Sequence, residues 1–103
     1  GDCSLPPEVK LALYRIVQEA LNNVVKHALA SQASVYLECQ PDQVTLRVSD
    51  DGCGFASEGI EPHKLGIGIM RERAKAIGAR FALESQRDQG THITVTWENT
   101  EYD

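Results

Sequence analysis

The chain has 103 residues, 42% hydrophobic content and a formal net charge of -5. This length and apolar content suit one domain with a single core, which needs neither metal nor disulfide to fold. The acidic balance disfavours wrapping of nucleic acid, because phosphate contacts need a basic face and the lysines and arginines are scattered. It leaves room for a small anionic ligand.

The cysteines Cys3, Cys39 and Cys53 are widely spaced and form no Cys-x-x-Cys pair. Neither a disulfide framework nor a zinc site is therefore indicated, and a reducing cytoplasm is the expected compartment. No apolar run approaches the length of a membrane span, and the first residues lack signal-peptide character. We expect this piece to be soluble, with any membrane anchor of the full-length protein elsewhere.

The first predicted element is a helix from about Pro7 to about Ala30. Proline in the first turn and the acid Glu8 beside the positive helix end are helix-entry signals. A helix of about 24 residues is longer than usual, so a break near Ala28 is expected. At 100° per residue, one broad apolar arc predicts contact with the core. That arc holds Leu13, Val17, Ala20, Leu21, Val24, Val25 and Ala28.

Beside this arc lies a narrow polar one that contains a carboxylate, a carboxamide, an ammonium and an imidazole group. Its members are Glu19, Asn23, Lys26 and His27. Such groups facing one way supply oxygen ligands for a hard cation and donors for phosphate. Taken alone, Glu19 and Asn23 are more often ordinary solvated side chains of a surface helix. The rest of the chain changes the balance between the two interpretations.

Residues 34–39 and 44–49 each alternate apolar with polar side chains around a Pro-Asp-Gln turn, which predicts an antiparallel hairpin with one buried face. The second strand runs into Asp50-Asp51-Gly52-Cys53-Gly54. The glycines let the backbone approach a bound group closely, and two acids stand at the strand end. In isolation, however, Asp-Gly after a strand indicates a turn first of all.

Residues 56–65 lack periodicity and contain a glycine and a proline, which predicts a loop. It is either a lid over a site or a tolerated surface insertion. Gly66-Ile67-Gly68 then leads into a second predicted helix, residues 70–77, with Gly78 as its C-terminal cap. A glycine-rich helix entry is where N–H groups and the helix dipole hold phosphate, although Gly-x-Gly by itself is a weak signal.

Residues 80–85 and 91–97 form a second predicted hairpin, and Gly90-Thr91 supplies a backbone N–H and a hydroxyl group at the start of its last strand. The acidic tail 98–103 is expected to fray. The order α-β-β-α-β-β predicts an α+β fold. This would be a two-layer α/β sandwich with helices on one face of a mixed, mainly antiparallel sheet and a wetter opposite face.

Four signals occur in one order: Glu-x-x-x-Asn-x-x-Lys-His in a helix, Asp-x-Gly-x-Gly after a strand, Gly-x-Gly before a helix, and Gly-Thr opening a strand. Together they resemble the ATP-binding catalytic domain of bacterial two-component sensor histidine kinases, members of the Bergerat-fold superfamily. The resemblance covers nearly all of residues 1–103, read as one domain excised from a larger protein. Residues 14–28 and 70–74 further resemble the nitrate-sensor-like subgroup.

The resemblance implies ATP and Mg²⁺ as cofactors. It matches Asn23 to the Mg²⁺ ligand, an amide oxygen that suits a hard cation, and Lys26 and His27 to contacts with phosphate. Glu19 holds the position of the general base in the superfamily's ATP hydrolases, and its role in a kinase is open because phosphoryl transfer depends mostly on positioning and charge neutralisation. Glu19, Asn23 and Lys26 are thus the candidate catalytic residues.

At the base end, the resemblance matches Asp50 to the aspartate that accepts a hydrogen bond from the adenine amino group. The carbonyl group of guanine would face that carboxylate unpaired. Thr91 matches a threonine near the adenine. The resemblance matches Gly52 and Gly54 to glycines that let the base approach closely. It matches Gly66 and Gly68 to glycines whose backbone amides contact the phosphates.

The chain departs from the family pattern in four ways, one of which is that the longer lid phenylalanine motif of other histidine kinases is missing. Lys64 stands where many relatives have a glycine, and a strand that relatives carry before Leu5 is missing, so the sheet is expected to be one strand short. The histidines His27, His63 and His92 all fall within the ATP-binding pattern or its loops. The phosphoacceptor histidine must therefore come from a dimerisation domain of the same protein.

The implied activity is that of a protein-histidine kinase catalytic domain, which donates the γ-phosphoryl group to that histidine and does little alone. The implied indirect partner is a response regulator with helix-turn-helix output; the domain itself touches neither nucleic acid nor membrane and works in the cytoplasm. Two alternatives stay open. One is a Bergerat-fold serine kinase of the anti-sigma-factor type, and the other is a non-catalytic nucleotide-sensing module, against which Glu19 and Asn23 argue.

Overall fold

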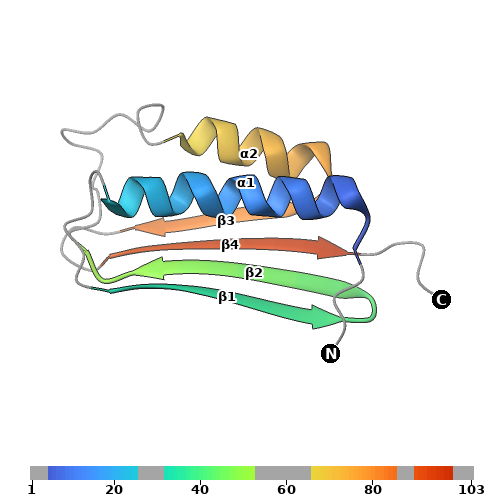
Figure 1. The fold of residues 1–103 in the computed structure, drawn as a ribbon, viewed down its shortest axis with the longest axis horizontal. Coiled ribbons are helices and arrows are strands. Elements are labelled where there is room, and N and C mark those ends of the chain that lie inside the picture. The colour runs from blue at the N-terminus through green and yellow to red at the C-terminus, as the bar shows by residue number, and fades with distance from the viewer. Residues whose placement is uncertain (1–4, 26–31, 53–65, 86–89, 99–103) are drawn as a thin grey trace.

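The computed structural model describes residues 5–25, 32–52, 66–85 and 90–98, and two helices lie on one face of a four-stranded sheet (Figure 1). The strand order is β1-β2-β4-β3, and every neighbouring pair is antiparallel. The predicted α+β two-layer sandwich is confirmed, with the described part of the sheet wholly antiparallel rather than mixed. The elements are α1 (Pro7–Asn23), β1 (Ala33–Gln40), β2 (Gln43–Asp50), α2 (Ile67–Ala76), β3 (Arg80–Ser85) and β4 (Thr91–Glu98).

Helix α1 begins at Pro7, as the sequence predicts. Proline has no N–H to leave unpaired in the first turn, and its fixed φ suits the helix. The carbonyl oxygen of Pro6 accepts hydrogen bonds from the N–H groups of Val9 and Lys10 at 3.0 and 3.1 Å. The regular helix ends at Asn23, after which Val24 and Val25 form a wider, π-helical turn. The predicted continuation to Ala30 and the break near Ala28 lie outside the described residues.

The buried face of α1 is rotated from the predicted apolar arc. Its centre is Ile16, which is fully enclosed, and Val9 and Ala20 flank it. Val25, which the pattern assigned to the core, is 84% exposed. On a helical wheel Val25 lies about 120° from Leu13, so the predicted arc was too wide to share one contact surface. The rotation brings the neighbouring polar arc towards α2.

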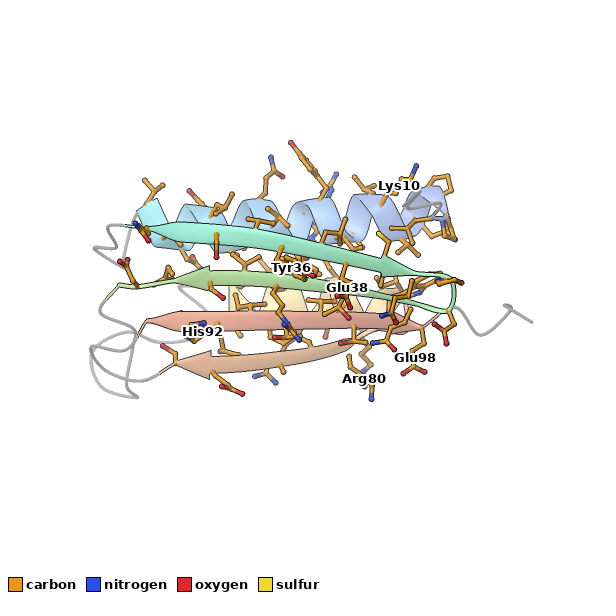
Figure 2. All side chains as sticks on the ribbon, turned by 90° about the horizontal axis from the view of Figure 1, so that it is seen from below. Lys10, Tyr36, Glu38, Arg80, His92 and Glu98 are labelled. Atoms are coloured by element: carbon orange, nitrogen blue, oxygen red, sulfur yellow. The ribbon has the colours of Figure 1, made fainter. Side chains whose placement is uncertain are left out.

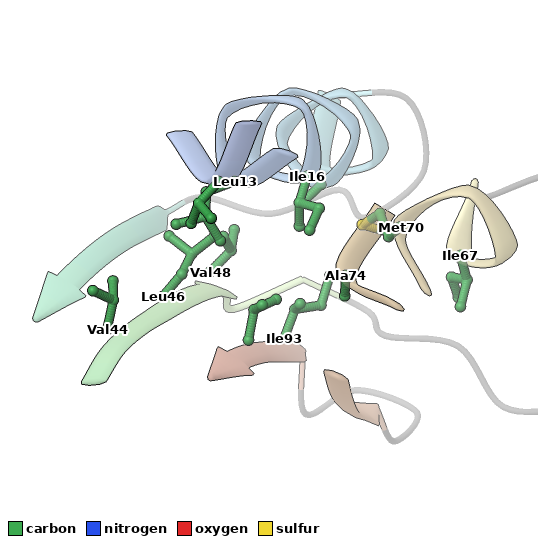
Figure 3. Close-up of a cluster of buried hydrophobic side chains, with 12 residues drawn as sticks. Leu13, Ile16, Val44, Leu46, Val48, Ile67, Met70, Ala74 and Ile93 are labelled. Carbon is green, nitrogen blue, oxygen red and sulfur yellow. The ribbon is translucent and has the colours of Figure 1, made fainter. Parts of the chain in front are cut away.

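One core fills the space between the helices and the sheet (Figure 3). The largest fully buried side chains are Ile16 of α1, Met70 of α2 and Val95 of β4. Because burial of each such side chain contributes about 1.5–3 kcal/mol, these contacts fix the two helices to the sheet. The remaining buried members are Val9, Leu13, Ala20, Val44, Leu46, Val48, Ile67, Ala74 and Ile93.

The opposite face of the sheet carries polar side chains, as expected, and Figure 2 looks onto it. The hydroxyl group of Tyr36 donates a hydrogen bond to Glu38 at 3.0 Å, and this carboxylate raises the pKa of Tyr36 above its usual value of 10.0. His92 also lies on this open face, paired with Ser49 and Glu84. The sheet therefore separates the His92 side chain from the helix layer.

Strand β1 is an edge of the described sheet, and every residue in it except Cys39 is exposed. Cys39 is disulfide-bonded, with a partner outside the described residues. The expectation that the chain has no disulfide is therefore wrong at this position. No helix in the described ranges is long and apolar enough to cross a membrane.

Candidate functional site

Most of the predicted site residues meet at one end of the molecule, on the left in Figure 1. There α1 ends at Asn23, β2 ends at Asp50, α2 begins at Ile67 and β4 begins at Thr91. The antiparallel order places the ends of β2 and β3 beside the start of β4. Residues far apart in the sequence therefore share one edge of the sheet, close to the helix layer.

A row of polar side chains lies across three strands at this edge. Asp50 pairs with Thr91, and Thr91 pairs with Ser85. Paired residues of neighbouring strands point to the same face, so all three point to the helix-covered face. We call these three residues the polar row. Two residues farther from this edge in each strand, the side chains on the same face are apolar. They are Val48, Ile93 and Leu83.

Asp50 is enclosed and held in place. Its side chain belongs to a residue that is only 9% exposed, and its Oδ1 accepts a hydrogen bond from the N–H of buried Gly52 at 2.8 Å. The Cα of Gly90 faces the carbonyl oxygen of Asp50 so closely that a Cβ at residue 90 would collide with it. Gly90 has φ +79°, which a residue with a side chain rarely adopts. The second carboxylate oxygen of Asp50 takes no part in the hydrogen bond with Gly52.

Asp51 has a different task from Asp50, although the two acids are adjacent. Its N–H donates to the carbonyl oxygen of Gln32 at 3.1 Å, and its Oδ1 accepts from the N–H of Gln32 at 2.9 Å. This pair of hydrogen bonds ties the end of β2 to the residue before β1. Asp51 is exposed and bonded to Gln32, whereas Asp50 is buried beside Thr91. Sequence reasoning did not identify Gln32.

The hydroxyl group of Thr91 lies 2.9 Å from that of Ser85, and the Ser85 hydroxyl also donates to the carbonyl oxygen of Gly90 at 3.3 Å. Ser85 and Thr91 are both half-buried. Thr91 belongs to the Gly-Thr motif of the sequence, whereas Ser85 belongs to none of its motifs. The alternation of β3 indicates that Ser85 points to the same face as Phe81 and Leu83. Only the strand register, which pairs Ser85 with Thr91, shows which residue it contacts.

Glu19 connects α1 to the start of α2. Gly66 precedes α2 with φ +69°, and a Cβ there would collide with the carboxylate of Glu19. The carbonyl oxygen of Gly66 accepts the first hydrogen bond of the helix, from Met70 at 3.0 Å. The helix thus starts at Ile67 rather than at the predicted Met70, and Gly68 lies in its first turn, exposed and with open space around it.

The first turn of α2 suits an anion. The N–H groups of the first turn of a helix have no acceptor within the helix and carry its positive dipole end. No acidic side chain occupies this turn. Shallow, open depressions adjoin both helices: one of about 420 Å³ beside Glu19 and one of about 750 Å³ beside Gly68. Neither has Asp50 or Thr91 among its described lining residues.

The remaining predicted site residues divide into two groups. Asn23 is half-buried at the last residue of α1 and takes part in an interaction there. The others, together with the predicted loop, lie outside the described residues: Lys26, His27, Gly54 and residues 56–65 with Lys64. The structure therefore brings Asp50, Gly52 and Thr91 together at the sheet edge and Glu19 with Gly66 between the helices.

A family model described as "Histidine kinase-, DNA gyrase B-, and HSP90-like ATPase" matches residues 8–101. The chain is 38% identical over 94 residues to the sensor histidine kinase LiaS of Bacillus subtilis (strain 168), which covers 91% of this chain and 26% of that protein. It is 37% identical over 94 residues to the sensor protein VraS of Staphylococcus aureus (strain COL), with coverage of 91% and 27%. The chain thus spans about a quarter of the length of these relatives.

Solved structures share the fold. The histidine kinase domain of the Erythrobacter litoralis EL346 blue-light activated histidine kinase superposes with a TM-score of 0.74 at 24% identity, covering 94% of this chain and 48% of that one. The Acinetobacter baumannii histidine kinase AdeS gives 0.72 at 15% identity, with coverage of 89% and 48%. The predicted resemblance is confirmed: the chain belongs to the family of histidine kinase-, DNA gyrase B- and HSP90-like ATPases, as a catalytic domain of the sensor histidine kinase type.

Proposed function

We propose that the chain, as a single catalytic domain of a larger protein, binds ATP together with Mg²⁺ at the sheet edge described above and donates the γ-phosphoryl group to a histidine of a dimerisation domain. The observation that carries the proposal is the enclosed carboxylate of Asp50, fixed at the same end of the molecule as the anion-suited start of α2. The enclosed acceptor suits the base of a nucleotide, and the helix start suits its phosphate chain.

At the base end, the hydrogen bond from Gly52 occupies Oδ1 of Asp50. We assign the other carboxylate oxygen to the amino group of adenine. In an enclosed site this hydrogen bond counts for more than in water. Guanine presents a carbonyl oxygen at the same place, which would leave two acceptors facing each other. Thr91 adds a hydroxyl group beside this contact, and Gly52 and Gly54 are assigned to close approach of the base, because a glycine has no side chain in the way.

At the phosphate end, we assign the N–H groups that follow Gly66, including that of Gly68, to phosphate oxygens. Lys26 and His27, which follow α1 in the sequence, are assigned to further contacts with the phosphates. The amide oxygen of Asn23 fits Mg²⁺, a hard cation that is usually held by few protein ligands together with phosphate oxygens and water. The metal would neutralise charge on the phosphates during transfer.

Glu19 is the candidate catalytic carboxylate. It is half-buried and lies against Gly66, next to the helix start assigned to phosphate. Transfer to histidine breaks the bond between the γ phosphorus and the oxygen that bridges to the β-phosphate, which keeps the electron pair. A P–N bond forms to a neutral imidazole nitrogen, so the acceptor does not have to be deprotonated first. We therefore assign Glu19 to positioning rather than to an essential general-base step.

We further propose that the dimerisation domain belongs to the same polypeptide and that a response regulator with helix-turn-helix output receives the phosphoryl group from it. The relatives named as sensor proteins are longer than this chain, which supports the idea of further domains. The compartment proposed for the reaction is the cytoplasm, where ATP is available. Binding of nucleic acid or membrane is not part of the proposed role.

The test is phosphotransfer to a purified dimerisation domain of the full-length protein, using ATP labelled at the γ position and Mg²⁺. We expect label on the dimerisation domain that is lost in acid and kept in base, because a P–N bond is acid-labile. Replacement of the acceptor histidine by alanine should abolish labelling. Acid-stable label would support the serine-kinase alternative instead, and ATP binding without any transfer would support the nucleotide-sensing alternative. Either result would refute the proposal.

A further inference from the structure

We propose that one side of α2 is the surface on which the phosphoacceptor helix of the dimerisation domain docks. The surface consists of Ile69, Glu72, Arg73 and Ala76, and we call it the α2 stripe. The inference rests on the proposed function, since it names the face that the partner contacts to receive the γ-phosphoryl group from the same site. The occupant is an amphipathic helix that carries the acceptor histidine.

The α2 stripe runs along the outer side of its helix. Its members follow the spacing i, i+3, i+4 and i+7, which places four side chains on one helix face. Together with Gly68 they line the open depression of about 750 Å³. On a helical wheel the α2 stripe is centred about 140° from the buried side of the same helix. That buried side consists of Ile67, Met70 and Ala74.

The chemistry of the α2 stripe suits another helix. Ile69 is 51% exposed and Ala76 is exposed as well, and burial of such apolar area stabilises a complex. Half-buried Arg73 forms no ion pair within the described residues, and its guanidinium group can pair with a carboxylate. The matching partner is a helix with apolar side chains on one face and an acidic side chain beside them, packed ridge into groove.

The position of the α2 stripe identifies that helix. The N–H groups that follow Gly66 are assigned to the phosphates, and Ile69 stands in the same first turn of α2. Transfer requires the imidazole nitrogen within about 3–3.5 Å of the γ phosphorus. Because a helix is about 10–12 Å across, a helix that brings its histidine this close also contacts the first turn of α2. A response regulator takes the phosphoryl group from that histidine and has no need to approach α2.

Two other surfaces near this turn suit the acceptor helix less well. The other flank of α2 is engaged with the sheet, since the guanidinium carbon of Arg71 lies 5.4 Å from the centre of the Phe81 ring in a cation–π contact. The depression beside α1 has mainly polar described lining residues, Gln18, Glu19 and Asn22 among them. Of these three surfaces, the α2 stripe alone joins apolar side chains to a half-buried arginine.

The experiment measures phosphotransfer from γ-labelled ATP at increasing concentrations of the separate dimerisation domain, and ADP affinity by calorimetry. Ile69→Gln removes the apolar side chain without adding charge near the phosphates. We expect the half-saturating concentration of dimerisation domain to rise about 5- to 10-fold, as for an energetically important interface residue, with ADP affinity as in the parent. Leu11→Gln is the matched control and should change neither value. Leu11 is 52% exposed and lies in the second turn of α1, a helix that starts at the opposite end of the molecule from α2 (Figure 1).

Arg73→Gln tests the charged part of the α2 stripe. It should raise the half-saturating concentration at least about 3-fold, the lower range for loss of a hydrogen bond. Lys75→Gln removes the same charge from the same helix outside the stripe and should leave this concentration as in the parent. Equal effects of the two substitutions, an unchanged half-saturating concentration in Ile69→Gln, or ADP affinity that falls as much as transfer would each overturn the inference.

A photo-crosslinking amino acid in place of Ile69 identifies the occupant directly. We expect a cross-link to the helix that carries the acceptor histidine, and none when the same amino acid replaces Leu11. A cross-link from position 69 to a second copy of this chain or to the response regulator, or no cross-link at all, contradicts the proposed docking.

Thermal melting without nucleotide shows whether each variant is folded. If Ile69→Gln does not fold, Ile69→Ala makes the same comparison with the same deciding outcomes. Failure of the proposed function looks different, because the parent chain itself would then bind no ADP or transfer no label, and both proposals would fall. A parent that transfers label while the α2 stripe has no effect refutes only the docking surface.

Discussion

The carboxylate of Glu19 occupies the space that a side chain at Gly66 would need, so the start of α2 rests directly on the polar arc of α1. Gly66 has φ +69° at this point. The contact joins a predicted catalytic carboxylate to a predicted phosphate-binding turn, two signals that lie far apart in the sequence. Helix α2 can therefore start against Glu19 only because Gly66 has no Cβ.

Gly66→Ala should destabilise the domain by about 1–3 kcal/mol, because the left-handed backbone alone costs about 1–2 kcal/mol and the Glu19 side chain must also move. Gly68→Ala is the matched control two residues on. Its Cβ would meet nothing within 4 Å, and alanine is favoured over glycine in a helix by about 0.5–1 kcal/mol. Urea unfolding should thus show a loss in the first variant and no loss in the second. Equal stabilities of Gly66→Ala and the parent would contradict the described contact.

Gly90→Ala should be more harmful than Gly78→Ala, although both glycines have positive φ, +79° and +73°. A Cβ at Gly78 has open space, whereas one at Gly90 would meet the backbone of Asp50 and Asp51. Backbone cannot rotate away as a side chain can. We expect a loss of about 1 kcal/mol for Gly78→Ala and at least about 2 kcal/mol more for Gly90→Ala. Similar losses in urea unfolding would show that the close approach to Asp50 does not matter.

The strands could be predicted almost to the residue. Alternation with period two and the turn residues between the strands are local signals, so the predicted 34–39 and 91–97 became Ala33–Gln40 and Thr91–Glu98. The start of α2 was predicted three residues late, because two glycines indicated a loop. The contact between Gly66 and Glu19, which places that start, joins distant parts of the sequence and no local pattern reveals it.

The site was predicted only in part for a similar reason. Asp50 could be identified from the strand-end motif, and the structure shows that it is buried. The face of α1 could not be placed, because Val25 and Ile16 are equally apolar in the sequence and only the sheet and α2 decide which one is buried. Ser85 was missed since its partner is set by the register of β3 against β4, which pairs it with Thr91.

Asn23→Asp should weaken ATP binding while leaving the fold intact. A new carboxylate would repel the triphosphate, and two unit charges about 4 Å apart interact by about 1 kcal/mol even in water. The loss should be larger in EDTA than with Mg²⁺, because the carboxylate can bind the metal and so offset part of the repulsion. Asn22→Asp is the control: it adds the same charge one residue away, at an exposed position. Calorimetry with and without Mg²⁺ checks this, and identical behaviour of the two variants would remove Asn23 from the metal site.

Asp50→Ala should weaken ATP binding by about 1–3 kcal/mol, the usual cost of an unmet hydrogen bond in an enclosed site, and should reduce discrimination against GTP. It also leaves the N–H of Gly52 without its acceptor, so stability without nucleotide has to be measured alongside. Asp51→Ala provides the contrast. It removes the hydrogen bond to Gln32 and should lower stability while the preference for ATP over GTP stays as in the parent. Unchanged ATP affinity and GTP rejection in a well-folded Asp50→Ala variant would mean that this segment is only a turn.

Asp50→Asn makes the sharpest distinction, because it changes the hydrogen-bonding character of the side chain and almost nothing else. Its amide oxygen can keep the hydrogen bond from the N–H of Gly52, which directs the amide NH₂ group to where the second carboxylate oxygen lies in the parent. That group would meet the amino group of adenine as donor against donor, whereas it would pair with the carbonyl oxygen of guanine. We therefore expect ATP binding to weaken by at least as much as in Asp50→Ala and GTP binding to strengthen, with melting close to the parent. If Asp50→Asn still prefers ATP as strongly as the parent, the carboxylate does not face the base and the assignment of the base end is wrong.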